Sequence, residues 1–191
     1  MSTYISKNRY LSEEEQQTNA RYIWDYLGSR GWTLNAVAAM LGNMETESTI
    51  NPGIWESLTV DTSRGYGLVQ WTPSTKYTDW CSSEGLDPSA LDSALKRIEY
   101  ELANGLQWIR TDAYDLSFQQ FKTSTATIEW LAMAFLHNYE RPASLDQPWR
   151  ATQAVKWYNY LSGTNPTPVK PKTKGMSLLL MWAATRHNVV R

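Results

Sequence analysis

The pattern of apolar and polar positions predicts a mainly helical chain. Ser12 followed by Glu15 has the spacing of a capping box, so we expect a helix to start there. Large apolar and aromatic residues at positions 22, 23, 26 and 27 would form the inner side of this helix. Gly28 or Gly31 is expected to end it, because glycine tolerates the backbone turn after a helix.

A second helix is predicted from Thr33, as its N-cap, to about Glu47. Its sequence from Leu34 onwards is apolar nearly all round, which is typical of a helix buried in the middle of a domain. Asn51-Pro52-Gly53 is expected to stop it, because proline cannot continue a helix.

The pattern changes between residues 51 and 71, where Pro, Gly, Ser and Thr are frequent, and residues 65–71 read as a short strand or hairpin. Helices then resume, since Thr72-Pro73 and Asp87-Pro88 each place a capping residue before a proline. Further helices are predicted at roughly 88–104, 125–138 and 147–161. The expected fold class is therefore mainly α (α+β): one helical domain over residues 12–162, with a small β-hairpin after its second helix.

Two segments follow the predicted domain. Residues 163–175 form a linker rich in Pro and Lys, and residues 176–191 join a short apolar run to a basic end. The apolar run is shorter than the roughly 18 to 20 residues that a membrane span requires, so no transmembrane span is expected. A short helix, a docking peptide and the start of another module all remain open for this segment.

The composition narrows the function. The chain has ten Trp and eleven Tyr but only three Phe. Trp and Tyr combine an apolar ring face with a polar group, and sugar-binding clefts use this combination. Ordinary packing is the alternative for each of these residues. The net charge of −1 argues against nucleic acid as a partner. Cys81 cannot form an internal disulfide, and the N-terminus has no apolar stretch typical of a secretory signal. His137 and His187 lack the context of a metal site, so no metal or cofactor is expected.

Glu47 is the candidate general acid. A carboxylic acid that donates a proton near neutral pH must hold that proton more tightly than usual. Burial beside an apolar helix, the negative end of the helix dipole and the nearby carboxylates of Glu45 and Glu56 would all favour the protonated form. Periodicity does not choose between Glu45 and Glu47, because both faces of the helix are apolar, and a solvated helix-end residue is the alternative for either.

Several motifs carry a family resemblance. Glu47-Ser48, Asn51-Pro52 and residues 67–70 (Gly-Leu-Val-Gln) resemble the Glu-Ser, Asn-Pro and Gly-Leu-Met-Gln signature of lytic transglycosylases and goose-type lysozymes. A longer agreement is with the phage tail lysozyme family, which the chain resembles from about residue 19 to 163. The motifs that carry it are Met40-Leu-Gly-Asn-Met44, Glu47-Ser-Thr-Ile-Asn-Pro-Gly53, Gly65-Tyr-Gly-Leu-Val-Gln-Trp-Thr-Pro73 and Tyr139-Glu-Arg-Pro142.

The resemblance implies a lysozyme-like fold and a muramidase that cuts between N-acetylmuramic acid and N-acetylglucosamine, with Glu47 protonating the glycosidic oxygen. Asp61, just ahead of the predicted hairpin, is the candidate second carboxylate, and an Asx-type turn is its alternative. An inverting enzyme would hold this group about 6.5 to 9.5 Å from the acid, and a retaining enzyme about 5 to 5.5 Å. In transglycosylase-like relatives one Glu suffices and the acetamido group of the substrate assists, so both routes stay open.

The candidate substrate-binding residues lie in the hairpin and in a late helix. Glycines would let the backbone approach the sugar, aromatic rings would stack on it, and an amide would bond its acetamido or hydroxyl groups. Tyr139 and Glu140 are expected to help set the environment of Glu47. In transglycosylase relatives a Tyr at a comparable helix end contacts the acid, and only Tyr139 matches that position in type. A local Glu140–Arg141 ion pair is the alternative. The full candidate set is Gly65, Tyr66, Gly67, Gln70, Trp71, Tyr139 and Glu140.

The implied setting is a phage virion tail, or a prophage-encoded equivalent, acting on the bacterial cell wall. The expected partners are peptidoglycan glycan strands, together with phage tail proteins or a second lytic module attached through the linker. Two rival functions remain: a non-catalytic wall-binding module on the same fold, and a structural tail protein, which should lack a deep cleft beside Glu47.

Overall fold

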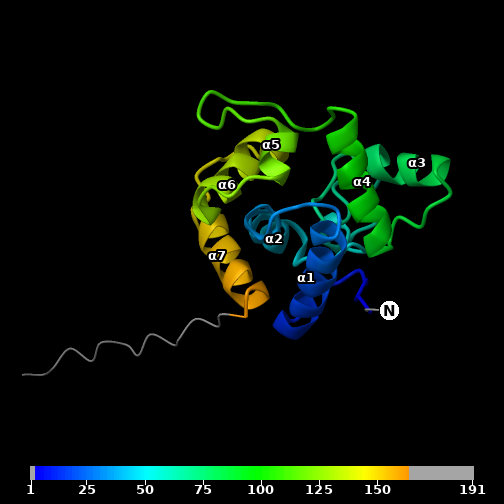
Figure 1. Cartoon of the computed structure of the whole chain (residues 1–191). Coiled ribbons are helices and arrows are strands. Elements are labelled where there is room, and N and C mark those ends of the chain that lie inside the picture. The colour runs from blue at the N-terminus through cyan, green and yellow to red at the C-terminus, as the bar shows by residue number, and fades with distance from the viewer. Residues whose placement is uncertain (1–2, 164–191) are drawn as a thin grey trace, which may run out of the picture.

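Helix α2 (Leu34–Ser48) runs through the middle of the molecule, with α1, α6 and α7 arranged around it (Figure 1). The computed structural model describes residues 3–163. Every residue from Ala36 to Met44 is buried, as the all-round apolar pattern predicted. Helix α2 packs most extensively against α7 (Trp149–Leu161) and then against α6 (Ile128–Phe135), so the core surrounds the helix that ends at the candidate acid.

The first two helices start where their local signals predicted. Helix α1 (Glu13–Gly28) has Ser12 as its N-cap, and both bonds of the capping box with Glu15 are present. The Thr33 side chain caps α2 by accepting a hydrogen bond from the backbone N–H of Ala36. These two helix starts are confirmed.

Two predicted helix starts are wrong. Helix α3 (Thr75–Ser83) begins after Thr72-Pro73, because the Thr72 hydroxyl donates to the carbonyl of Gln70 instead of capping a helix. Helix α4 (Leu91–Ala103) likewise begins after Asp87-Pro88, because the Asp87 carboxylate accepts from the backbone and hydroxyl of Ser89. In both places a local turn takes the hydrogen bond that a helix cap would have made.

The later helices differ from the prediction mainly at their ends. A short helix α5 (Phe118–Lys122) was not predicted, although Ser117 and Gln120 form a capping box at its start. Helix α6 starts at Ile128 and continues as a π-helical turn, η2 (Leu136–Glu140). Such π-turns are rare and occur often at functional sites.

The mainly helical class is confirmed, but the β-hairpin is not. Between residues 51 and 71, where the hairpin was predicted, the structure has isolated antiparallel bridges that join Tyr66 to Trp55 and to Trp71. The same segment contains a short 3-10 turn, η1 (Glu56–Leu58). The predicted linker beyond Gly163 and the C-terminal segment 176–191 lie outside the described residues.

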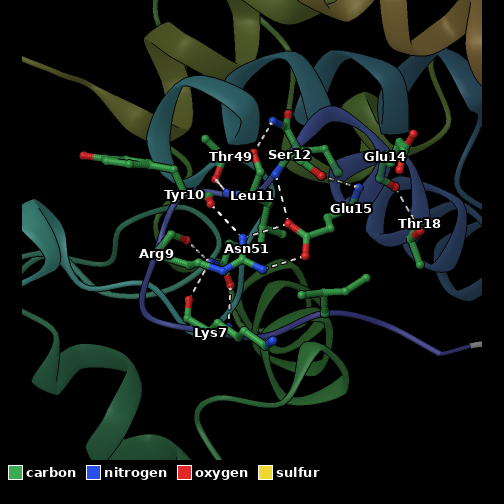
Figure 2. A network of polar contacts seen from close by, with 12 residues as sticks. Lys7, Arg9, Tyr10, Leu11, Ser12, Glu14, Glu15, Thr18, Thr49 and Asn51 are labelled. Carbon is green, nitrogen blue, oxygen red and sulfur yellow. Dashed lines mark hydrogen bonds and ion pairs between the residues drawn. The ribbon is translucent and has the colours of Figure 1, made fainter.

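Residues 3–11 form an arm that is bonded to the domain (Figure 2). The side chain of Asn51 donates to the carbonyls of Lys7 and Arg9, at 2.6 and 2.7 Å, and its oxygen accepts from the backbone N–H of Lys7. Leu11 N–H donates to the Thr49 hydroxyl at 2.9 Å. The arm is thus fastened to the turn that directly follows α2.

Replacing Asn51 by Ala should lower the free energy of unfolding by about 2 to 3 kcal/mol, because buried backbone groups lose their partners. Urea unfolding measures this difference. The matched control is Asn104→Ala, which removes one exposed bond to the Tyr100 carbonyl and should change stability by about 0.5 kcal/mol or less. Equal effects of the two substitutions would show that Asn51 does not hold the arm.

Candidate functional site

A cleft with a volume of about 580 Å³ opens beside the end of α2. Its walls come from the arm, the end of α2, the irregular segment between α2 and α3, and the end of η2 with the turn that follows it. The start of α3 and the segment after α4 add one residue each. Such a cleft is large enough for a small organic ligand. It is lined by Tyr10, Thr46, Glu47, Ile54, Trp55, Glu56, Ser57, Val69, Gln70, Trp71, Thr72, Lys76, Gln107, Tyr139, Glu140, Arg141 and Pro142.

Glu47 lies in the wall of this cleft and is paired with a buried arginine. Arg150 Nη2 donates to Glu47 Oε1 at 2.5 Å, and the side chains of Arg150 and Glu47 are 3% and 20% exposed. Arg150 also donates through Nε to Gln147 and through Nη1 to Asn43, so each nitrogen of its guanidinium has a partner. The pair holds Glu47 in one position at the edge of the cleft.

Glu45 faces away from the cleft. Its carboxylate accepts from Lys156 Nζ at 2.6 Å and from Trp157 Nε1 at 2.7 Å, which are both on α7. Glu45 is not among the lining residues. The structure therefore separates the two carboxylates that periodicity left equivalent, and only Glu47 is in contact with the cleft.

A second buried network holds two of the aromatic residues of the cleft. Glu101 on α4 is 1% exposed and accepts from Tyr139 hydroxyl at 2.5 Å, Trp71 Nε1 at 3.0 Å and Arg97 Nε at 2.8 Å. The Trp71 ring also stacks on Tyr77, with centroids 4.3 Å apart. Trp71 and Tyr139 are thus fixed from behind, which preorganises that wall of the cleft.

Glu140, at the end of the π-turn, has an unusual environment. Its Oε1 atom is buried and has no hydrogen-bond partner among the described residues. Burial raises the pKa of the Glu140 carboxyl well above its ordinary value, and the negative charge of Glu47 raises it further. Arg150 and Arg141 oppose this shift without cancelling it. These surroundings shift the half-buried Glu140 carboxyl towards its neutral form.

The predicted substrate-binding residues divide into two groups. Gln70, Trp71, Tyr139 and Glu140 line the cleft, whereas Gly65, Tyr66 and Gly67 do not. The amide of Gln70 donates back to the Gly67 carbonyl at 2.9 Å, and the Tyr66 ring packs on Trp55. Gly67 has a φ of +81°, so the backbone of the turn is sufficient reason for a glycine at this position. The roles of all seven in binding substrate stay predictions.

Asp61 lies outside the set of cleft residues. Its carboxylate accepts from the backbone N–H and the hydroxyl of Ser63, at 2.9 and 2.7 Å, and pairs with Arg64. This is the Asx-type turn that sequence analysis left as the alternative. Glu56, in contrast, lines the cleft and accepts from Gly65 N–H at 2.9 Å. Asp61, from the sequence, and Glu56, from the lining of the cleft, are thus the two candidates for a second carboxylate.

Three residues in or behind the cleft wall were not predicted from the sequence. Arg150 shares the buried face of α7 with Ala154 and Trp157. A charged residue on an otherwise apolar helix face is rarely buried without a partner, and this was the available signal for a buried ion pair. Glu101 similarly occupies a buried position of α4. Tyr10 reaches the cleft from the arm and is 62% exposed, and no local pattern pointed to it.

Neither a metal site nor a membrane-spanning helix is found in the described part of the chain. Within residues 3–163 there is no group of three or more His, Cys, Asp or Glu side chains that could hold a metal ion. None of the helices in this part of the chain is long and apolar enough to cross a bilayer. Cys81 is buried, and burial raises the pKa of its thiol.

Comparison with known proteins gives two findings. Residues 18–161 match a family described as phage tail lysozyme. The chain is also similar to "Morphogenesis protein 1" of Bacillus phage B103, with 51% identity over 168 residues, which are 87% of this chain and 46% of the relative. The chain therefore spans about half the length of this curated relative.

Proposed function

The chain belongs to the phage tail lysozyme family, and we propose that it hydrolyses the glycosidic bond between N-acetylmuramic acid and N-acetylglucosamine in peptidoglycan. Family membership indicates a lysozyme-like, peptidoglycan-degrading role at a coarse level. The bond that is cut, and the residues that cut it, are our proposal. The observation that carries it is the position of Glu47, an acid held in the wall of a cleft lined by aromatic and polar side chains.

In this proposal Glu47 is the catalytic acid. It gives a proton to the glycosidic oxygen, the bond from that oxygen to the anomeric carbon breaks, and water adds to that carbon. The proton released by the water returns to the carboxyl groups of the cleft. Arg150 keeps the Glu47 side chain in place through this cycle, because its buried guanidinium is fixed by Asn43 and Gln147.

The glycan strand would lie against the aromatic lining. Trp55 and Tyr10 are the aromatic lining residues with exposed surface, whereas Trp71 is only 3% exposed and stacks on Tyr77 within the wall. Aromatic faces stack on the apolar faces of sugar rings, and the surrounding polar groups can bond acetamido and hydroxyl groups. Glu101 positions Trp71 from behind.

A second carboxylate is needed if the enzyme uses a general base or a nucleophile. Glu56 lines the cleft, whereas Asp61 is bonded within its own turn, so we expect Glu56→Gln to lose about 100-fold in rate and Asp61→Asn less than about 3-fold. The initial rate of cell-wall clearing measures both. A large loss in Asp61→Asn alone would instead support the sequence-based choice, and full activity in both would indicate the transglycosylase route.

The experiment that tests the function is clearing of purified Gram-positive cell walls by the wild-type chain, followed by mass analysis of the released sugars. Reducing ends identify a hydrolase, and 1,6-anhydro ends identify a lytic transglycosylase acting on the same bond. Walls that bind the protein without clearing would favour the rival function of a non-catalytic wall-binding module.

The proposed setting is the tail of a phage virion, or a prophage equivalent, acting on the cell wall during penetration. The family and the phage relative support a phage context. Phage tail proteins or a second lytic module are the partners that we propose for the Pro- and Lys-rich segment. Binding of the full chain to tail components tests this part.

A further inference from the structure

Glu140 is the only residue of the described cleft with a buried carboxyl oxygen that lacks a hydrogen-bond partner. The comparison with Glu101 is informative, because that buried carboxylate accepts from three donors. A buried acceptor without a donor costs free energy, and an unpaired buried charge costs much more. The environment of Glu140 therefore suits a neutral carboxylic acid.

The charges around Glu140 come from three helices and from its own turn. Glu47 acts on it from α2, Glu101 from α4 and Arg150 from α7. Arg150 is already bonded to Glu47, Asn43 and Gln147. The neighbouring Arg141 donates to the backbone carbonyls of Gln107 and Asn138. Both arginines are thus engaged elsewhere.

We propose that Glu140 stores the proton of the cleft in the free enzyme and passes it to Glu47, which allows Glu47 to act as the acid although it is paired with Arg150. This inference rests on the proposed function and makes Glu140 a proton-supplying partner rather than the residue that attacks the substrate. Two neighbouring carboxyl groups readily share one proton, because placing a negative charge on both of them at once costs free energy.

The proton balance closes over one cycle. The proton leaves the Glu140 carboxyl for the Glu47 carboxylate, and Glu47 gives it to the glycosidic oxygen as the bond to the anomeric carbon breaks. The water that adds to that carbon releases one proton, which restores the neutral carboxyl of Glu140. In a transglycosylase the proton of the attacking sugar hydroxyl would play the same part.

The first test is the pH dependence of wall clearing by Glu140→Gln, with the exposed Glu84→Gln as the matched control. The raised pKa of Glu140 keeps its proton available as pH rises, so the wild type should stay active at neutral pH. Glu140→Gln should be at least about tenfold slower at pH 7 and approach the wild type near pH 5, where solvent protonates the cleft directly. An equal loss at every pH, or no loss, would overturn the proposal.

The second test does not depend on activity. Infrared spectra of protein labelled with carbon-13 glutamate should show the carbonyl stretch of a protonated carboxyl at neutral pH, and Glu140→Gln should remove it. Should that variant fail to fold, Glu140→Asp keeps the acid but removes the labelled group, so the labelled band must again disappear.

A spectrum without this band would show Glu140 to be ionised and end the proposal, while leaving the proposed function intact. Absence of wall clearing by the wild type would contradict the function and leave the infrared result to decide on Glu140.

Discussion

Glu47→Gln should clear cell walls about two to three orders of magnitude more slowly than the wild type, the loss expected on removal of a general acid. Glutamine has nearly the same shape as glutamate and can still accept a hydrogen bond from Arg150, so the buried guanidinium keeps a partner. It cannot give a proton to the glycosidic oxygen. The initial rate of turbidity loss measures the effect.

The matched control is Glu45→Gln, which makes the same chemical change two residues earlier on the same helix. The Glu45 carboxylate faces Lys156 and Trp157 on α7 and does not line the cleft. This variant should keep clearing walls within about threefold of the wild-type rate, once circular dichroism has established the folded fraction of each protein.

Two results would contradict the assignment of Glu47. Full clearing by Glu47→Gln would place the catalytic proton on another group, and Glu56 and Glu140 are then the acids of the cleft left to test. Equal losses in Glu45→Gln and Glu47→Gln would indicate that the effect comes from disturbed packing of α2 against α7.

Local signals in the sequence were sufficient for the helices that carry their own caps. The Ser12–Glu15 box and the Thr33 cap are set by residues three positions apart, so the first two helices could be placed directly. The same reasoning failed at Thr72 and Asp87, because polar side chains before a proline can bond a turn as well as a helix end. Short-range patterns do not decide between these two outcomes.

The environment of the candidate acid could not be predicted, since it depends on pairs far apart in the chain. The motif located Glu47, but its partner Arg150 lies 103 residues later. The sequence predicted an acid in a poorly solvated place with only negative neighbours. The structure instead pairs Glu47 with a cation and leaves a buried carboxyl oxygen without a partner at Glu140. Only the packing of α2 against α7 and against α6, which continues into η2, brings these three groups together.

That packing depends on Gly42, which leads to the second large expected effect. A Cβ atom at position 42 would lie 2.5 Å from the carbonyl oxygen of Arg150 and 2.6 Å from the backbone nitrogen of Ala154. These are backbone atoms, which cannot rotate away, so α7 would have to move off α2. Gly42→Ala should therefore lower the free energy of unfolding by about 3 kcal/mol, despite the higher helix propensity of alanine.

The control for this prediction is Gly28→Ala in α1, where the added Cβ would meet only the ring of Trp24, at 3.1 Å. A side chain can shift by a few tenths of an ångström, so this variant should stay within about 1 kcal/mol of the wild type. Urea unfolding compares the two. The carbonyl that the new Cβ would strike belongs to Arg150, whose guanidinium also holds Glu47. The fraction of Gly42→Ala protein that stays folded should therefore clear walls more slowly than the wild type. Wild-type stability and activity in Gly42→Ala would mean that the spacing of α2 and α7 does not position the acid.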